Sequence, residues 1–180
     1  MEYFVFVDNS NVWIEGKVAS AVAKGVAKNP YDAHQRGIED STWRIDYGKL
    51  LDVVTNGNLK DINKAVLYGS KPPHNDSLWQ AIKDAQYEVN TLARNAVGKE
   101  KAIDTSIVCD INKYLYTVSK ADDVFVLVMG DKDFLPAIEA IRKYKRKAIV
   151  VFWNNASSEL ISGADKYIDL TPELTRITYY

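Results

Sequence analysis

The fold of this chain follows from the stretch Val124-Phe125-Val126-Leu127-Val128-Met129-Gly130-Asp131-Lys132-Asp133-Phe134. Its first six residues are all apolar, without the alternation of a strand that has one face in water. Such a run predicts a strand buried on both faces, as in a parallel sheet. Gly130 then permits a sharp turn, and Asp131 and Asp133 follow where the strand leaves the core. Ligands of open α/β sheets bind outside the carboxyl ends of the strands, so two acids at this point indicate a site.

The start of the chain repeats this arrangement. The apolar run Tyr3–Val7 predicts a first strand, and Asp8-Asn9-Ser10-Asn11 follows it directly. Carboxylates that converge at strand ends repel one another, and a hard divalent cation is the usual compensation. Because both predicted strands are followed by acids, we expect these acids to form one shared site.

Length and composition limit the class of protein. A chain of 180 residues can form one domain with a full core. The net charge of −1 gives no overall basic field, so nucleic-acid binding would need a local patch. The single cysteine, Cys109, excludes an internal disulfide, suits a reducing compartment and is expected to be buried. The apolar runs are too short for a signal peptide or a membrane span, so we expect a cytoplasmic protein without a membrane partner.

Strands alternate with helices along the rest of the chain, which predicts an α/β fold with a mostly parallel sheet. The expected strands cover residues 3–7, 64–68, 87–92, 124–129, 148–153 and 167–170. The expected helices cover residues 13–28, 47–54, about 75–85, 104–119, 134–144 and 158–163, with a polar loop over 31–41.

Four acids form the candidate site, namely Asp8, Asp104, Asp131 and Asp133. Mg²⁺ or Mn²⁺ held by such acids can polarise a phosphoryl group and activate water, which is the chemistry of phosphodiester hydrolysis. Each acid also has a plain structural interpretation, since Asp commonly closes turns or caps helices. Asp110 follows Asp104 by six residues, which places it about 120° away around a helix and makes it the weaker candidate.

Residues near these acids are candidates for substrate contact. Asn9 and Asn11 offer amide groups beside Asp8, although Asn11 could equally close a turn. Trp13 could stack on a base of single-stranded RNA or lie buried. The basic residues that follow strand ends or precede Asp104 are Lys71, Arg94, Lys99, Lys101 and Lys132.

A second group of basic residues lies at the end of the helix predicted over 134–144. It comprises Lys143, Lys145, Arg146 and Lys147. These residues could contact phosphate. The favoured interpretation is interaction with the helix dipole and with solvent, because this end lies opposite the carboxyl ends of the strands.

Motifs spread over nearly the whole chain resemble the NYN family, the LabA-like (DUF88) branch of the PIN-like nucleases. They are Phe6-Val7-Asp8-Asn9-Ser10-Asn11, Arg44 to Leu51, Leu67 to Pro73, Lys99 to Asp104, Gly130 to Pro136, and Ser158-Glu159-Leu160 through Ala164-Asp165. Residues 15–42 lie outside the pattern as an insert that could act as a lid, form a homodimer contact, or be a surface excursion. Met129 stands where the family commonly has Ser or Thr, and Ala102 replaces a common glycine.

The resemblance implies a single domain over residues 1–180 with a PIN-like Rossmannoid fold. Its three α/β/α layers would surround a mostly parallel sheet of five to six strands in the order 3-2-1-4-5. It also implies a Mg²⁺- or Mn²⁺-dependent ribonuclease that acts on single-stranded or structured RNA through the four acids, with Ser158 among the substrate-binding residues. The alternative is a catalytically weak module on the same fold that binds RNA or protein. A phosphatase acting through phospho-aspartate is disfavoured, because Ser10 stands where such an enzyme has its second acid.

Overall fold

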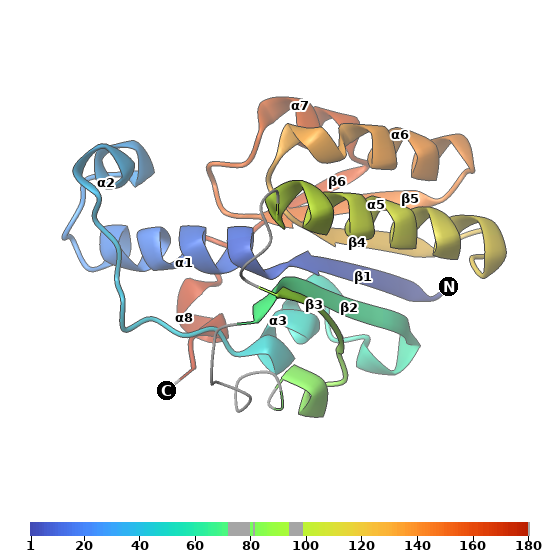
Figure 1. The fold of residues 1–180 in the computed structure, drawn as a ribbon, viewed down its shortest axis with the longest axis horizontal. Coiled ribbons are helices and arrows are strands. Elements are labelled where there is room, and N and C mark those ends of the chain that lie inside the picture. Colours follow the sequence, from blue (N-terminus) through green and yellow to red (C-terminus); the bar gives the residue numbers. More distant parts are fainter. Residues whose placement is uncertain (72–79, 81, 94–98, 180) are drawn as a thin grey trace.

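The computed structural model describes residues 1–71, 80, 82–93 and 99–179, and for residues 70–71, 92–93 and 99–101 it describes the backbone alone. A six-stranded sheet forms the middle of the molecule (Figure 1). The strands are β1 (Tyr3–Asp8), β2 (Ile62–Lys71), β3 (Glu88–Ala93), β4 (Val124–Val128), β5 (Lys147–Phe152) and β6 (Lys166–Asp169).

All five strand pairings are parallel, and the strand order is β3-β2-β1-β4-β5-β6. This confirms the predicted α/β class and the order 3-2-1-4-5, and β6 extends the sheet by one strand at its edge. The chain moves outward from β1 in one direction through β2 and β3, and in the other from β4 through β5 and β6. The switch point therefore lies between β1 and β4, where the carboxyl ends carry Asp8 and Asp131.

Helices cover both faces of the sheet. They are α1 (Asn9–Ala23), α2 (Pro30–Arg36), α3 (Tyr47–Val54), α5 (Lys99–Thr117), α6 (Leu135–Lys143), α7 (Ser158–Gly163) and α8 (Leu174–Ile177), with short 3-10 turns η1 (Leu59–Asp61) and η2 (Lys132–Phe134). One face carries α5, α6 and α7, and the other carries α1, α3 and α8 (Figure 1).

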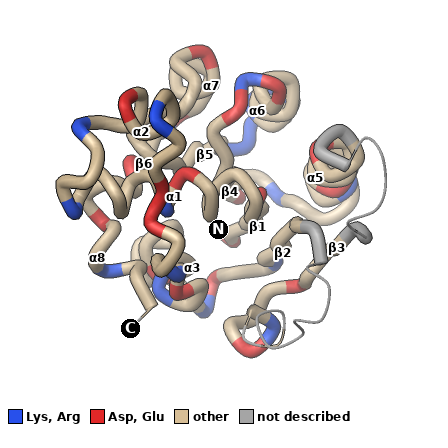
Figure 2. The backbone as a smooth tube through the Cα atoms, turned by 60° about the vertical axis from the view of Figure 1, so that its left-hand side comes forward, with Lys and Arg blue, Asp and Glu red and all other residues tan. Residues whose placement is uncertain are grey.

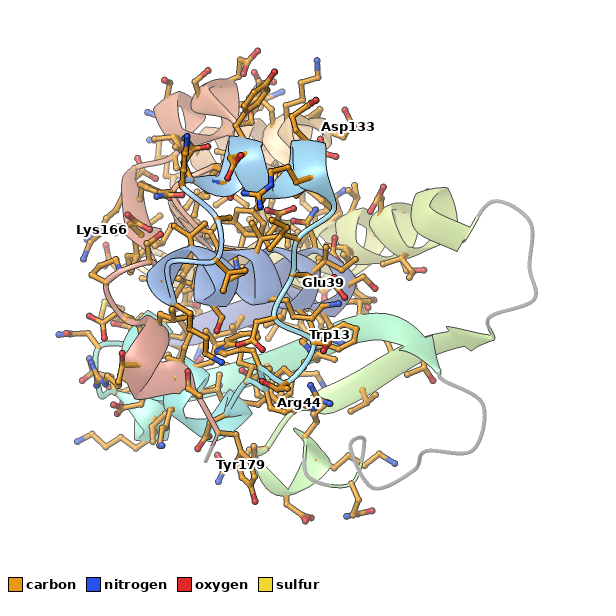
Figure 3. All side chains as sticks on the ribbon, turned by 90° about the vertical axis from the view of Figure 1, so that its left-hand side faces the viewer. Trp13, Glu39, Arg44, Asp133, Lys166 and Tyr179 are labelled. Atoms are coloured by element: carbon orange, nitrogen blue, oxygen red, sulfur yellow. The ribbon has the colours of Figure 1, made fainter. Side chains whose placement is uncertain are left out.

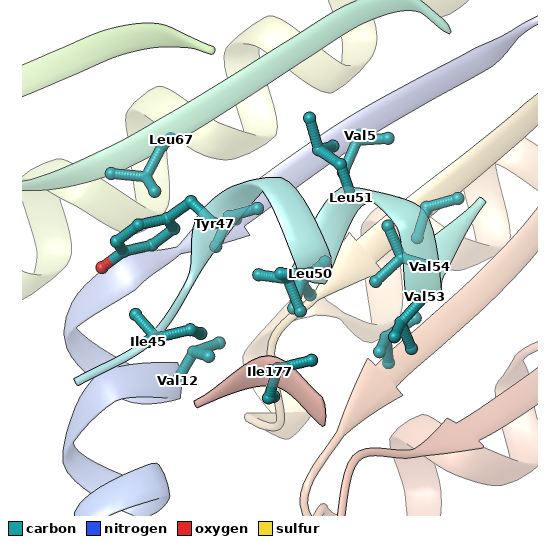
Figure 4. Close-up of a cluster of buried hydrophobic side chains, with 14 of the residues drawn as sticks. Val5, Val12, Ile45, Tyr47, Leu50, Leu51, Val53, Val54, Leu67 and Ile177 are labelled. Atoms are coloured by element: carbon teal, nitrogen blue, oxygen red, sulfur yellow. The ribbon is translucent and has the colours of Figure 1, made fainter. Parts of the chain in front are cut away.

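The alternation of side chains along β1 divides the interior into two cores. Phe4 and Phe6 point into the core beneath α5, α6 and α7, while Val5 and Val7 point into the core beneath α1 and α3. All four are fully buried, as expected for a strand of a parallel sheet with helices on both faces. Figure 4 shows the second core, in which α3 packs against β1, β2 and α8.

The helix predicted over residues 47–54 matches α3 residue for residue. Its Asp46 caps the first turn by accepting a hydrogen bond from the Lys49 N–H at 3.0 Å, and Leu50, Leu51 and Val54 are buried as the spacing requires. Trp43 and Trp153 are buried and pack edge to face with ring centroids 5.8 Å apart.

Two helix boundaries differ from the prediction. Helix α1 begins at Asn9, immediately after β1, because Asp8 caps it, and it ends at Ala23 rather than near Lys28. Helix α5 begins at Lys99, so Asp104 lies in its second turn and not at its N-terminus. The predicted helix over about 75–85 lies mostly outside the described residues.

Two further predictions were wrong. Residues 31–41 are not a loop throughout, because Asn29 accepts a hydrogen bond from the Asp32 N–H at 2.8 Å and caps α2. Cys109 is exposed, since it lies on the water-facing side of α5 rather than among the buried isoleucines.

The segment from α1 to α3 forms a small core of its own. Val18, Ala27 and Ala33 are buried together, so α2 packs on α1 rather than on the sheet. Charged contacts hold the segment after α2 against α1. Asp40 accepts hydrogen bonds from the Ser20 hydroxyl and the Lys24 ammonium, both at 2.6 Å.

Candidate functional site

Asp8 occupies the centre of the carboxyl edge and has two roles at once. Its Oδ1 accepts a hydrogen bond from the Asn11 N–H at 3.3 Å, so it caps α1. Its residue surface is only 7 % exposed, and this burial raises the pKa of its carboxyl to about 6. The negative charges of Asp104 and Asp131 raise it further, whereas backbone hydrogen bonds from Asn11 and Ser10 oppose the change. Asp8 therefore both caps α1 and belongs to the acidic cluster.

Asp131 reaches the site from the end of β4. Its carboxylate accepts a hydrogen bond from the Asp133 N–H at 3.0 Å and caps η2. Gly130 before it is needed for close packing and not, as predicted, for turn conformation. A Cβ at this position would overlap the Phe152 ring, and the Gly130 carbonyl accepts a hydrogen bond from the Ser157 N–H at 2.9 Å. The end of β4 is thus held against both β5 and the start of α7.

Asp104 approaches from α5 on the other face of the sheet. It is partly buried, and its charge acts on Asp8 across the switch point. Asp133 is exposed and does not cap α6, whose first turn follows Phe134 without a side-chain cap. The capping interpretation of Asp133 was therefore wrong, because Asp131 provides that cap to the preceding turn.

Asp104 and Asp131 are both near enough to Asp8 for their charges to act on its carboxyl. Within the described part of the chain, no three His, Cys, Asp or Glu side chains are grouped closely enough to hold a metal ion by themselves. Mg²⁺ does not need a group of three such side chains, because it usually binds one or two carboxylates and keeps several waters. The buried Asp8 carboxyl, whose charged form is disfavoured by burial and by two nearby negative charges, is the chemical feature that a cation would relieve.

The predicted substrate-contacting residues around Asp8 have different surroundings. Asn9 is buried and its Oδ1 accepts a hydrogen bond from the Tyr47 hydroxyl, so its amide oxygen braces α1 against α3. Asn11 is partly buried, and its backbone N–H is the group that Asp8 holds. Trp13 is also partly buried, and the Lys17 ammonium lies 4.3 Å from the centroid of its indole ring.

Lys17 is an unusual residue that sequence reasoning missed. It is 7 % exposed, and its ammonium forms an ion pair with Glu39 at 2.7 Å while lying over Trp13. Trp13 and Glu39 therefore come together in front of α1, as Figure 3 shows looking onto the carboxyl edge. The four-residue spacing of Trp13 and Lys17 on one helix face was the available signal.

The basic candidates fall into two groups. Arg94 and the side chains of Lys71 and Lys101 lie outside the described residues. Lys132 is exposed and follows Asp131 directly. The pKa of Glu159 is lowered mainly by backbone and serine hydrogen bonds, and the charge of Lys132 lowers it further. Ser158 begins α7 and donates a hydrogen bond to the Glu159 carboxylate at 3.2 Å. Lys132 and Ser158 thus lie at the same side of the edge, around Glu159.

Tyr68 is a second residue that sequence reasoning missed. It pairs with Asp8 in the register of β1 and β2, and its hydroxyl donates a hydrogen bond to Asp110 Oδ2 at 2.7 Å. Asp110, which the helical spacing places on a different side of α5 from Asp104, therefore already has a hydrogen-bond partner.

The profile of the NYN domain matches residues 4–171, nearly the whole chain and every element around the acidic edge. This chain belongs to the NYN domain family. NYN domains have a PIN-like nuclease fold, and nucleases of this fold are generally dependent on divalent metals. The acidic edge of this NYN domain lies where such a fold places its ligands.

A solved structure agrees with this membership at the level of the fold. The NYN domain described here superposes on a protein of unknown function from Vibrio parahaemolyticus with a TM-score of 0.65 and 21 % sequence identity. The match covers 94 % of this chain and 92 % of the Vibrio chain. No curated protein matches the sequence. Among the described residues, no helix has the length and apolar character needed to cross a membrane.

Proposed function

We propose that this NYN domain is a divalent-metal-dependent ribonuclease that hydrolyses phosphodiester bonds at the carboxyl edge of its sheet. The observation that carries the proposal is the buried Asp8 carboxyl, whose pKa is raised to about 6 by burial and by the charges of Asp104 and Asp131. An acidic cluster at the switch point of an α/β sheet is unfavourable by itself and becomes favourable when a cation joins it.

Asp8 and Asp131 are the proposed main metal ligands, with Asp104 as a third acid and Asp133 acting through water. Mg²⁺ or Mn²⁺ bound there would polarise a phosphoryl oxygen and activate water for attack. The residues of the chain would position the RNA around this point. Lys132 is exposed and offers a cation to a phosphate. Trp13, Asn9, Asn11 and Ser158 remain the other proposed contacts, together with Lys71, Arg94 and Lys101.

The test compares wild type with Asp131→Asn on single-stranded, duplex and structured RNA, with Mn²⁺ present. Asparagine keeps an oxygen that can accept the Asp133 N–H, so the cap survives while the charge is lost. Asp122→Asn is the matched control, because Asp122 is exposed in the turn before β4 at the opposite edge and Asn tolerates its φ of 71°. We expect cleavage to be lost in Asp131→Asn only. Equal cleavage by all three proteins would show that the site assignment is wrong.

A catalytically weak RNA-binding or protein-interaction module is the second candidate, and Met129 favours it. This residue is fully buried in the core beneath α5 and α6, where the family commonly has a hydroxyl. It therefore brings no polar group to the acidic edge. Calorimetric titration with Mn²⁺ separates the candidates. Retained RNA binding without Mn²⁺ binding at millimolar concentration would support the second.

Two broader expectations, a cytoplasmic location and a homodimer contact through residues 15–42, stay predictions. Gel filtration with light scattering would measure the oligomeric state directly.

A further inference from the structure

A basic surface lies at the edge of the sheet opposite the acidic site. The stretch Arg142-Lys143-Tyr144-Lys145-Arg146-Lys147 holds five basic residues and no acid. Lys143, Lys145 and Lys147 are exposed, and none of the three has an ion pair with any residue that the structure describes. By contrast, Arg142 contacts Asp165 at 3.3 Å and donates a hydrogen bond to the Gly163 carbonyl.

The helix dipole accounts for only part of this group, since Lys143 lies in the last turn of α6. Helix α6 ends at Lys143, so Lys145 and Lys147 lie beyond its last turn, where the effect of the dipole fades. Charges elsewhere are interspersed along the backbone (Figure 2), in keeping with the net charge of −1. An unpaired cluster of one sign at the end of α6 therefore needs another explanation.

Two exposed aromatic residues lie within the basic surface. Tyr116 is 53 % exposed and Tyr144 is 45 % exposed. Their rings pack edge to face, with centroids 4.7 Å apart and an interplanar angle of 72°. In such a pair one ring keeps a face available, and bases of single-stranded nucleic acid stack on rings of this kind.

The surface is held in place by Arg146. Its guanidinium donates to the Ser119 hydroxyl at 3.1 Å and to the Ser119 carbonyl at 3.0 Å, and also to the Tyr144 carbonyl at 2.8 Å. These bonds tie the end of α5 to the turn after α6. The lysines and tyrosines are thus presented on a fixed frame, which lowers the entropic cost of binding.

The distance to the acidic site follows from the elements that connect them. Tyr116 lies twelve residues beyond Asp104 on the same helix, which is about 18 Å at 1.5 Å per residue. Lys147 pairs with Val124, and Asp131 follows Val124 by seven residues, which is roughly 20 Å along the strand direction. One extended RNA strand can span such a separation.

We propose that Lys143, Tyr144, Lys145 and Lys147, together with Tyr116, form a binding surface for single-stranded RNA that lies outside the cleaved segment. The lysines contact phosphates, and one base stacks on the tyrosine pair. A surface that combines exposed cations with exposed aromatic rings fits a nucleic-acid strand, which alternates charge and base, better than a uniformly charged partner. The proposal rests on the proposed function in that it takes RNA as the ligand.

The test measures how tightly the full chain binds fluorescent oligouridylates in EDTA at several salt concentrations. The oligonucleotides are about four and about twenty nucleotides long, because single-stranded sites span roughly 4–16 nucleotides. The variant is the triple Lys143→Gln, Lys145→Gln, Lys147→Gln. The control triple is Lys28→Gln, Lys60→Gln, Lys166→Gln, three exposed lysines with the same total charge.

We expect the variant triple to bind the long oligonucleotide about tenfold more weakly, with a salt slope lower by about 2, since each phosphate contact on a single strand contributes about 0.7. The short oligonucleotide should be weakened in the same direction, because four nucleotides already fill the smallest single-stranded sites. Tyr144→Ser should weaken long-RNA binding about tenfold without changing the salt slope, while Tyr144→Phe should not.

Equal loss in both triples would overturn the proposal. Binding of phosphatidylserine vesicles that depends on the three lysines, with RNA binding unchanged, would overturn it in favour of an anionic membrane. A failure here leaves cleavage by wild type and its loss in Asp131→Asn intact, so the two proposals fail separately.

Discussion

The Tyr68 hydroxyl donates a hydrogen bond to Asp110 Oδ2 at 2.7 Å, from the strand position directly beside Asp8. This bond joins the carboxyl end of β2 to α5, the helix that carries Asp104. Burial is the main reason why the pKa of Tyr68 is raised, and the bond to Asp110 adds to it, so the phenol stays protonated as a donor. The strand that lies beside Asp8 is therefore fastened, at the level of the site, to the helix that carries Asp104.

Tyr68→Phe is expected to lower the free energy of unfolding by about 1–2 kcal/mol, because Asp110 loses its buried donor. Tyr144→Phe, at an exposed tyrosine, should change it by less than about 0.5 kcal/mol. Urea denaturation in EDTA measures both. Equal stability of the two variants would mean that the bond to Asp110 contributes nothing.

Asp8→Asn should make the metal-free protein more stable at neutral pH. The folded pKa of Asp8 is about 6 and its ordinary value is 3.8, so the folded state binds more protons between these pH values. Stability contributed by this group is therefore lost as pH rises from about 4 to about 6. The difference corresponds to at most about 3 kcal/mol, and asparagine avoids that loss while keeping an oxygen for the Asn11 cap.

The measurement is denaturation of wild type and Asp8→Asn in EDTA from pH 4 to pH 8. We expect their difference to grow across pH 4–6 and to level off above pH 7. A difference that stays constant with pH would show that Asp8 does not titrate in this range.

Asp104→Asn should lower the pKa of Asp8, because it removes one of the two charges that raise it. A ¹³C NMR titration of the Asp8 carboxyl in EDTA would measure the change. Asp110→Asn is the matched control on the same helix, since its amide oxygen can still accept the Tyr68 hydroxyl. An unchanged pKa in Asp104→Asn would mean that Asp104 is too distant to share a cation with Asp8.

Gly130→Ala should destabilise the fold by about 1–3 kcal/mol, because the added methyl group overlaps the Phe152 ring. Phe152→Leu removes that overlap at the cost of a smaller core. In a double-mutant cycle the two changes should be less harmful together than the sum of the single changes. Strict additivity, measured by denaturation, would exclude the packing explanation for this glycine.

Much of the sheet could be predicted from the sequence. Strands such as β4 and β5 are continuous apolar runs bounded by polar residues, which is the pattern of a parallel strand with helices on both faces. The site acids Asp8 and Asp131 were located by the same pattern, because each follows the last apolar residue of its run. The strand order came from the family resemblance and not from periodicity.

The missed features depend on contacts that no local pattern records. Helix α2 is short and polar, and it is held by the Asn29 cap and by burial of Ala33 against α1. The first turn of α5 is Lys99-Glu100-Lys101, which has no apolar residue to mark a helix start. Gly130 looked like a turn residue, and only the neighbouring strand shows that its missing side chain makes room for Phe152.

The two-sided burial of β1 has a consequence for how mutations would reach the acidic edge. Phe4 and Phe6 depend on one helical layer, and Val5 and Val7 depend on the other. Asp8 is the next residue of the same strand, so loosening either layer displaces the same carboxylate. We expect a random-mutagenesis screen for lost cleavage to return folded variants from both layers in similar numbers. Cleavage activity would then respond to smaller changes in core packing than the melting temperature does.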